Sequence, residues 1–246
     1  MLIITADDYG KNKFITDRIL TCSNKKRITS ASVMVFMEDS KRAAEIANFN
    51  NLEFGLHINL TTPFTSSDNN IKLLEHQKKI ISFFSLFKLA PFIYNPFIEN
   101  SLEYLIKKQQ DEFIYLYKRE PYFYNGHHHI HLCANILIKK LLNSNIPIRL
   151  SFCFFYGEKS AINRLLRSWL NSYLKKKYIT TDYFFSLSPI SNQIRISKII
   201  NMAKRHNVEI MVHPEKDDVF NFLISNKFSN LIRNNKLGFF YELIHY

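Results

Sequence analysis

Short apolar runs alternate with longer amphipathic stretches along the whole chain. The runs have the length of buried strands, and the stretches between them carry apolar residues at helical spacing. We expect strands at Leu2–Ala6, Ala31–Phe36, Leu52–Leu60, Tyr122–His131, Pro147–Phe152, Asp182–Leu187, Val208–His213 and Leu237–Tyr241. We expect helices at about 13–26, 39–48, 101–118, 136–145, 161–176, 192–206 and 217–232.

The alternation of strands and helices predicts βα units and a largely parallel sheet. Roughly seven or eight such units in 246 residues are typical of an α/β fold of the TIM-like barrel type. No Gly/Ser linker, repeat or low-complexity block divides the chain, so we expect a single domain over residues 1–246. No G-x-G-x-x-G pattern follows the first strand, which argues against a dinucleotide-binding Rossmann site.

The segment from Thr61 to Asn100 departs from this alternation. It is too long for an ordinary βα loop and too rich in aromatic residues for a disordered one. We therefore interpret about 61–100 as a lid-like insertion beside the active face.

Acidic and histidine residues lie at or near the ends of four predicted strands. They are Asp7 and Asp8, His57, the run His127–His131, and His213. Each has a simple structural explanation by itself, such as a helix cap for the acids or a hydrogen-bonded core histidine. In parallel α/β folds, however, the carboxyl ends of the strands meet at one face, where the chemistry takes place. The coincidence of all four therefore indicates a functional site.

The residue types in this group suit metal-assisted hydrolysis. One carboxylate and two imidazoles with open positions make a catalytic metal site. Two adjacent acids can have different roles, because one can bind the metal while the other takes a proton from water. In an extended segment His127, His129 and His131 point one way and His128 the other, so at most two or three of them can face one metal.

Several motifs, in this order, resemble the YdjC-like carbohydrate deacetylases, a family that includes the ChbG-type chitooligosaccharide deacetylases. The motifs are "ITADDYG", "TSASVMV", "GLHINLT", "HHHIH" and "MVHP", and the closing "FFYELIHY" looks like the family's last strand. The resemblance covers most of the chain. It implies a deformed (β/α) barrel, one divalent metal ion such as zinc or magnesium, and removal of an N-acetyl group from an amino sugar in an oligosaccharide, glycan or glycolipid precursor.

The resemblance also implies roles for individual residues. The metal ligands would be Asp8, His57 and His127. Asp7 would be the general base, His213 the acid that protonates the departing amine, and Arg149 a residue that orients a carboxylate. His129, His131 and Asn125 are the candidate substrate contacts.

The chain departs from the family pattern at two points near the site. Asn125-Gly126 stands where the family usually has Asp-Ser, which removes a charge near the metal, and Glu215 follows "HP" where the family often has a small residue. Two alternatives stay open, and the first of them is favoured by Asn125. One is a catalytically weak or silent sugar-binding relative. The other is a metal-dependent hydrolase of a different bond, such as a phosphoester.

The composition of the chain limits which classes of binding partner we expect. Lys+Arg 33 against Asp+Glu 21 gives a net charge of +12, which favours acidic partners. No nucleic-acid-binding module is recognisable, so we expect no nucleic acid partner. Three cysteines without C-x-x-C spacing indicate a reducing compartment. With no signal peptide and no long apolar segment visible, we expect a cytoplasmic protein, and a homodimer is compatible with the sequence.

The stretch "INRLLRSWLNSYLKKK" has a basic amphipathic pattern, with apolar residues at 162, 165, 166, 169 and 173. An outer barrel helix packed on the sheet is the favoured interpretation. The alternative is a surface that meets anionic lipid. Together with the Phe-rich residues 80–98, the alternative suggests a membrane-peripheral location and a lipid-linked sugar as substrate.

Overall fold

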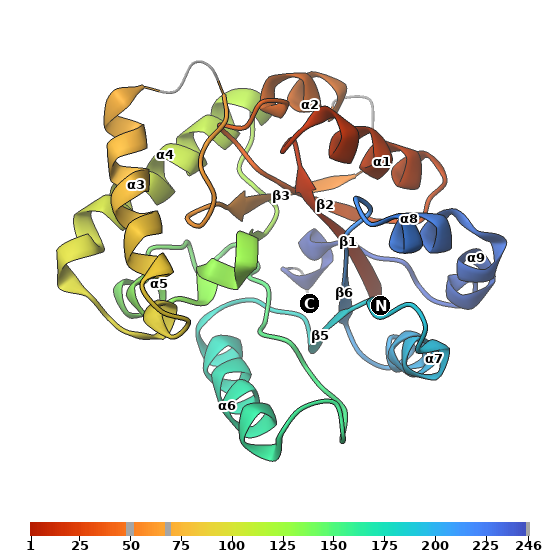
Figure 1. The fold of residues 1–246 in the computed structure, drawn as a ribbon. Coiled ribbons are helices and arrows are strands. Elements are labelled where there is room, and N and C mark those ends of the chain that lie inside the picture. The colour runs from red at the N-terminus through yellow and green to blue at the C-terminus, as the bar shows by residue number, and fades with distance from the viewer. Residues whose placement is uncertain (48–51, 67–69, 245–246) are drawn as a thin grey trace.

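A six-stranded parallel sheet forms the centre of the protein in a computed structural model that describes residues 1–47, 52–66 and 70–244. The strand order is β4-β3-β2-β1-β6-β5. The strands are β1 (Leu2–Tyr9), β2 (Ser30–Val33), β3 (Glu53–Ile58), β4 (Tyr124–Gly126), β5 (Tyr183–Ser186) and β6 (Val208–Val212). Figure 1 shows the sheet curling at the centre with helices around its outside. The predicted α/β class and parallel sheet are confirmed, and the curled sheet is consistent with a deformed TIM-like barrel.

Helices follow the strands in the order that the amphipathic stretches predict. They are α1 (Lys13–Asn24), α2 (Ser40–Ala47), α3 (Ile71–Ser85), α4 (Glu99–Tyr117), α5 (Ala134–Lys139), α6 (Ala161–Lys177), α7 (Gln193–Met202), α8 (Asp217–Ile224) and α9 (Asn226–Ile232). Side-chain caps begin several of them, as where Asn12 accepts from the Ile15 amide at the start of α1. None of the helices in the described ranges combines the length and the apolar character that crossing a bilayer requires.

Two predicted strands are reduced to single bridges. Residues 147–153 run between the edge strands β4 and β5, where Ile148 pairs with Tyr124 and the Cys153 amide donates to the Phe184 carbonyl. Leu237 pairs with Leu2 in an isolated bridge, and a short 3₁₀ helix, Phe240–Leu243, follows. The prediction of strands at Pro147–Phe152 and Leu237–Tyr241 is therefore wrong in extent, although the first of these segments spans the gap between the sheet edges.

The prediction of one extended segment over Tyr122–His131 is also wrong. β4 ends at Gly126, and His127–Leu132 form a 3₁₀ turn in which His128 and His129 have left-handed φ values of 52° and 58°. The alternating directions expected for a strand do not apply to this run. Gly126 permits the turn, because a Cβ there would come within 2.7 Å of the His131 backbone nitrogen.

The long segment after β3 contains a helix. In its described part, α3 packs against α4, and His76 Nδ1 lies 3.0 Å from the Ser101 hydroxyl. Two short 3₁₀ turns, Ala90–Phe92 and Pro96–Ile98, connect α3 to α4. Residues 67–69 of the predicted lid and residue 48 of the predicted second helix lie outside the described residues. The lid role of 61–100 stays a prediction.

Candidate functional site

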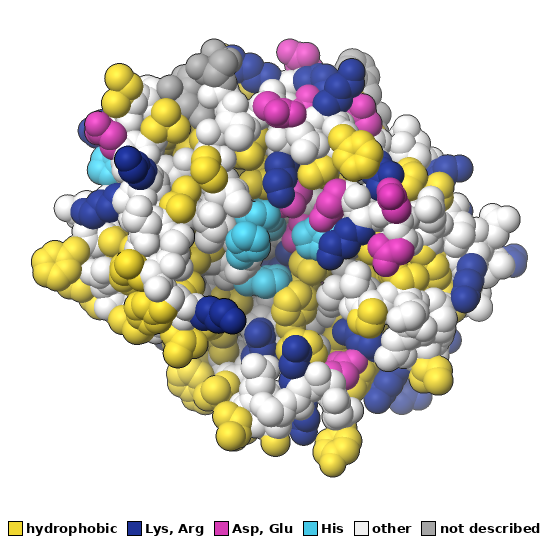
Figure 2. Space-filling model, viewed as in Figure 1, with side chains coloured by type: hydrophobic (Ala, Val, Ile, Leu, Met, Phe, Trp, Pro, Cys, Tyr) yellow, Lys and Arg dark blue, Asp and Glu magenta, His cyan; other side chains and the backbone are white. Residues whose placement is uncertain are grey.

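The residues predicted from the strand ends come together at one end of the sheet. Asp7 and Asp8 lie in the last part of β1, His57 lies in β3, His127 follows β4 and His213 follows β6. Figure 2 shows histidine side chains with acidic side chains beside them in a hollow at the middle of this face. The parallel sheet therefore gathers side chains that are up to about 200 residues apart in the sequence.

Asp8 stands at the centre of this group. Its Oδ1 lies 3.3 Å from His57 Nε2 and 3.1 Å from His127 Nδ1, and Lys11 Nζ lies 3.0 Å from its Oδ2. Burial alone would raise the pKa of Asp8, but the imidazoles of His127 and His57 hold that pKa well below its usual range. The Asp8 backbone has φ 71°, a left-handed conformation that aspartate tolerates better than most residues. This turn aims the carboxylate at the two rings.

The donor set of Asp8, His57 and His127 fits a divalent metal ion. All three residues are buried, and their ligand atoms lie within 4.8 Å of one another. Ligands at ~2.0–2.1 Å from a tetrahedral ion are roughly 3.3 Å apart, which is close to the separations between Asp8 Oδ1 and the two imidazole nitrogens. The mixture of one carboxylate and two imidazoles is compatible with zinc and with other divalent ions.

Asp7 is held by a buried arginine. Arg149 donates to both carboxylate oxygens of Asp7, from Nη1 at 2.6 Å and from Nη2 at 2.8 Å, and the Ser32 hydroxyl also donates to Asp7. Burial alone would raise the pKa of Asp7, but Arg149 holds it well below its usual range. The Asp7 carboxylate is therefore ionised across the physiological pH range, and Arg149 contacts both of its oxygens.

The sequence did not identify the second partner of Arg149. Glu209 in β6 accepts from Arg149 Nε at 2.8 Å, and both side chains are buried. The guanidinium, which would be costly to bury alone, therefore lies between two carboxylates inside the sheet. A single acid inside the apolar run "VEIMV" was the available signal, because an acid in a buried strand needs a partner.

His213 lies at the edge of the hollow with an acid beside it. Its Nδ1 is 3.1 Å from Glu215 Oε1, and its side chain is 25% exposed. Burial lowers the pKa of His213, but the neighbouring carboxylate of Glu215, followed by Asp7, outweighs this and raises the pKa overall. Asp8, His213 and Glu215 also form a second group of possible metal ligands among the described residues. His213 can serve as a proton donor or as a ligand, but not as both at once.

The Asn125 amide lies between the His57 ring and the Arg149 guanidinium. One end of the amide is 2.7 Å from His57 Nδ1, and the other is 2.9 Å from both terminal nitrogens of Arg149. Because Arg149 offers only N–H groups, the amide oxygen belongs on its side, and the amide NH₂ then donates to His57 Nδ1. A ring that accepts at Nδ1 carries its proton at Nε2, the atom that faces Asp8. A protonated nitrogen cannot bind a metal, so binding there requires the amide to turn over.

We expect Asn125→Asp to strengthen the binding of a divalent metal by about 10- to 100-fold, the range typical of partners behind a ligating histidine. A carboxylate can accept from His57 Nδ1–H and from Arg149 at the same time. The ring proton then stays on Nδ1, and His57 Nε2 can bind the metal. Isothermal titration of the metal-free protein with zinc or magnesium measures the change. Ser32→Ala is the control, because it removes a neighbouring hydroxyl and leaves the Asn125 amide in place. An unchanged or weaker affinity in Asn125→Asp would contradict this account.

The remaining histidines of the run have different environments. His131 is fully buried, and its Nε2 lies 3.0 Å from the Arg149 carbonyl oxygen. His129 packs edge-on against Phe152, and burial, followed by Arg149, lowers its pKa to about 3. His128 is exposed. The predicted substrate contacts of His129, His131 and Asn125 stay predictions; His131 and Asn125 have no exposed surface in this structure.

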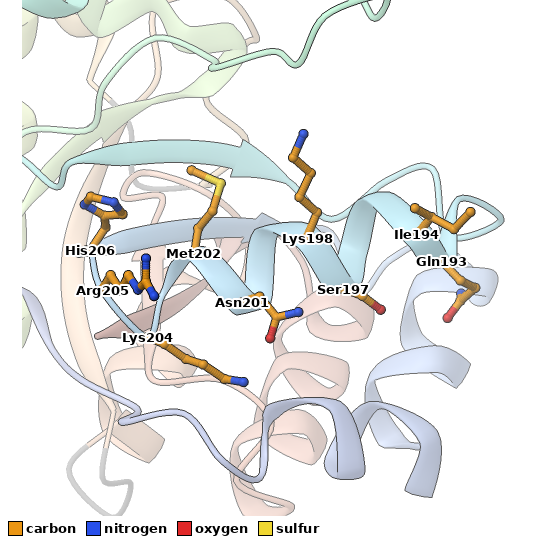
Figure 3. Close-up of a pocket in the computed structure, with 9 residues that line it drawn as sticks. All are labelled: Gln193, Ile194, Ser197, Lys198, Asn201, Met202, Lys204, Arg205 and His206. Carbon is orange, nitrogen blue, oxygen red and sulfur yellow. The ribbon is translucent and has the colours of Figure 1, made fainter.

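A further surface hollow lies elsewhere. It has a volume of about 920 Å³ and is formed by α7 and the turn that leads into β6, including Lys198, Arg205 and His206. Figure 3 shows Lys198 on α7, and Arg205 and His206 beyond the end of that helix. The hollow contains none of the residues predicted for the site, and His206 precedes the amino end of β6, whereas His213 follows its carboxyl end. The candidate site is therefore the group around Asp8.

Comparisons with known proteins agree with the geometry. The sequence model of the YdjC-like proteins matches residues 1–235. A carbohydrate deacetylase of Clostridium beijerinckii is 26% identical over 217 residues, which cover 87% of this chain and 80% of that protein. A carbohydrate deacetylase of Danio rerio is 25% identical over 136 residues, which cover 55% of this chain and 43% of that protein.

A solved structure shares the fold. It is the crystal structure of a candidate cellobiose-phosphate cleavage protein of Enterococcus faecalis, which has a TM-score of 0.69 and 16% sequence identity with this chain. The match covers 98% of both chains. At this level of identity the similarity concerns the fold alone.

Proposed function

Because the chain belongs to the YdjC-like protein family, we propose that it is a carbohydrate deacetylase that uses a divalent metal ion to remove the N-acetyl group of an amino sugar. The relatives named carbohydrate deacetylase support the substrate class. The observation that carries the proposal is the buried group of Asp8, His57 and His127, with the Asp7–Arg149 pair directly beside it.

In this proposal Asp8, His57 and His127 hold the metal. When bound, the ion would polarise the acetamide carbonyl and stabilise the negative charge that develops on its oxygen. Arg149 and Ser32 fix the direction of the Asp7 carboxylate. Asp7 takes the proton from the water that attacks the carbonyl carbon.

Breaking the C–N bond requires a proton on the nitrogen, because an amide anion is a very poor leaving group. His213 is the proposed donor, on the side of the hollow where β6 ends. The neighbouring Glu215 favours the protonated ring and keeps it ready to donate. The products are acetate and the free amino sugar.

Glu215→Gln should move the alkaline limb of the activity profile to lower pH. Only protonated His213 can donate, so activity falls as the pH rises through the pKa of His213. Removing the Glu215 charge lowers that pKa, and the fall begins earlier. Measuring kcat/KM across the pH range tests the shift. Asp217→Asn is the control, because its exposed carboxylate pairs with Arg18 and should leave the profile unchanged. Identical profiles for Glu215→Gln and the wild type would rule out this role for Glu215.

The direct test of the function is acetate release from a panel of N-acetylated amino sugars and oligosaccharides, together with the number of metal ions bound. Acetate release with one metal supports the proposal.

The second candidate is hydrolysis of another bond, such as a phosphoester. The group of Asp8, His213 and Glu215 favours this candidate, because it offers a second metal position. Two bound metals with phosphate release and no acetate would support that candidate. Sugar binding without either product would identify a silent relative, which the Asn125 amide favours.

A further inference from the structure

Helix α6 turns its apolar side away from the protein. Ile162, Leu165, Leu166 and Trp169 follow helical spacing and are 72%, 70%, 61% and 70% exposed. The favoured interpretation from the sequence, in which these residues pack on the sheet, is therefore wrong for these four positions. The side chains that α6 buries are Asn171 and Leu174.

The inward side of α6 is mixed, because Leu170, Tyr173 and Leu174 pack on the core and basic residues lie beside them. Arg164, Arg167 and Lys175 line a cavity of about 270 Å³ between the helix and residues 152–155, three of which are phenylalanines. Their hydrogen bonds go to backbone carbonyls and to the Asn163 side chain. A helix that faces water normally keeps its large apolar side chains on the inward side, whereas α6 carries four more of them on its outward side. The outward side of α6 is thus suited to an apolar medium.

A second apolar segment lies on the same face of the molecule. Residues 86–97 connect α3 to α4, and their large exposed side chains are Leu86, Phe87, Leu89, Phe92, Ile93 and Phe97. In Figure 2 hydrophobic side chains gather over the end of α3 and over α6, on the face that also shows the histidines. We call residues 86–97 together with the outward side of α6 the apolar rim. Contiguous exposed apolar surface of this kind marks a site of interaction.

The charges next to the apolar rim are positive. Neither residues 86–97 nor α6 contain an acidic residue, whereas Lys88 lies within the first segment and Lys176 and Lys177 end the second. All three lysines are exposed. A second copy of this chain would bring the same lysines against one another, which disfavours self-association through the rim. An anionic surface complements them.

We propose that the apolar rim docks on the surface of an anionic phospholipid membrane. Trp169 and its apolar neighbours enter the boundary between headgroups and acyl chains, and Lys176 and Lys177 contact lipid phosphates. The opening with the histidines then lies beside the membrane, on the docked face. This inference rests on exposure and charge and does not depend on the proposed reaction.

Trp169 is the single tryptophan of the chain, so its fluorescence can be used to follow docking. Vesicles of phosphatidylcholine with phosphatidylglycerol, added at low salt, should shift Trp169 emission to the blue and carry the full-length protein into the pellet. Vesicles of phosphatidylcholine alone should do neither, or much less. The absence of both signals with anionic vesicles overturns the proposal.

Variants separate the contributions of the apolar and the basic residues to vesicle binding. Leu165→Ser with Leu166→Ser should weaken vesicle binding by more than tenfold, and Lys176→Gln or Lys177→Gln by about fivefold each. Ile194→Ser, at an 85% exposed position on α7, is the matched control and should bind like the wild type. If the double serine variant binds vesicles unchanged, or if it only converts a dimer to a monomer in light scattering, the rim is not a membrane surface.

Discussion

Asp7→Asn is expected to lower kcat by about 10²- to 10⁴-fold, the loss typical of a missing general base, while metal binding persists. The amide keeps the size of the carboxylate but cannot take a proton from water. The three proposed ligands, Asp8, His57 and His127, are unchanged, so the metal content of the purified variant should match the wild type. Rapid-quench or steady-state acetate release, together with metal analysis, checks both halves of this prediction.

The same substitution has a structural consequence that needs its own control. Asp7 is one of two carboxylates on the buried Arg149, so its loss should also lower the free energy of unfolding, by up to about 3–5 kcal/mol. Glu209→Gln removes the other carboxylate without touching the proposed reaction. It should lose stability but retain most of the turnover. If Glu209→Gln loses as much turnover as Asp7→Asn, the effect is structural and Asp7 is not the base.

Asp8→Ala is expected to abolish both metal binding and turnover. Removing a ligand should cost more affinity than the roughly 10- to 100-fold that follows loss of an outer partner. Titration calorimetry on the metal-free protein and acetate release measure the two losses. A fully active Asp8→Ala protein, or one with the wild-type metal affinity, would remove Asp8 from the metal site.

Two further variants distinguish the loss of the metal ligand from other effects of changing Asp8. Asn tolerates the left-handed backbone at position 8 better than Ala, so Asp8→Asn distinguishes loss of the ligand from backbone strain. Lys11→Met removes the other charged partner of Asp8 but keeps the three ligand atoms. It should bind metal at least as well as the wild type, because a positive charge near the cation is gone.

The candidate site could be located in the sequence because parallel strands impose a rule. Each strand points its carboxyl end to the same edge, so acids and histidines that follow apolar runs must gather there. Asp8, His57 and His127 were placed together on this basis and on the family resemblance, and the structure brings them within 4.8 Å of one another. The family resemblance implied that Arg149 orients a carboxylate; in the structure Arg149 makes a bidentate contact with Asp7, and its role stays a prediction.

The strand boundaries were less predictable where hydrogen bonding across the sheet decides them. Residues 147–152 have the apolar composition of a strand but lie between two sheet edges and pair at one bridge. The histidine run has β-like neighbours, but the close approach of Gly126 to His131 turns the chain. Both outcomes depend on backbone partners that are distant in the sequence.

The sequence by itself determined the fold class, the edge of the sheet where the site lies and the residue types available there, because these follow from periodicity and from strand direction. Only the tertiary structure decided which neighbour each polar atom meets: the Asn125 amide between His57 and Arg149, and the Glu209 carboxylate behind Arg149. It also decided that α6 turns its apolar side outward. Helical spacing shows that a helix has an apolar side, but the packing of the rest of the chain determines whether that side is covered.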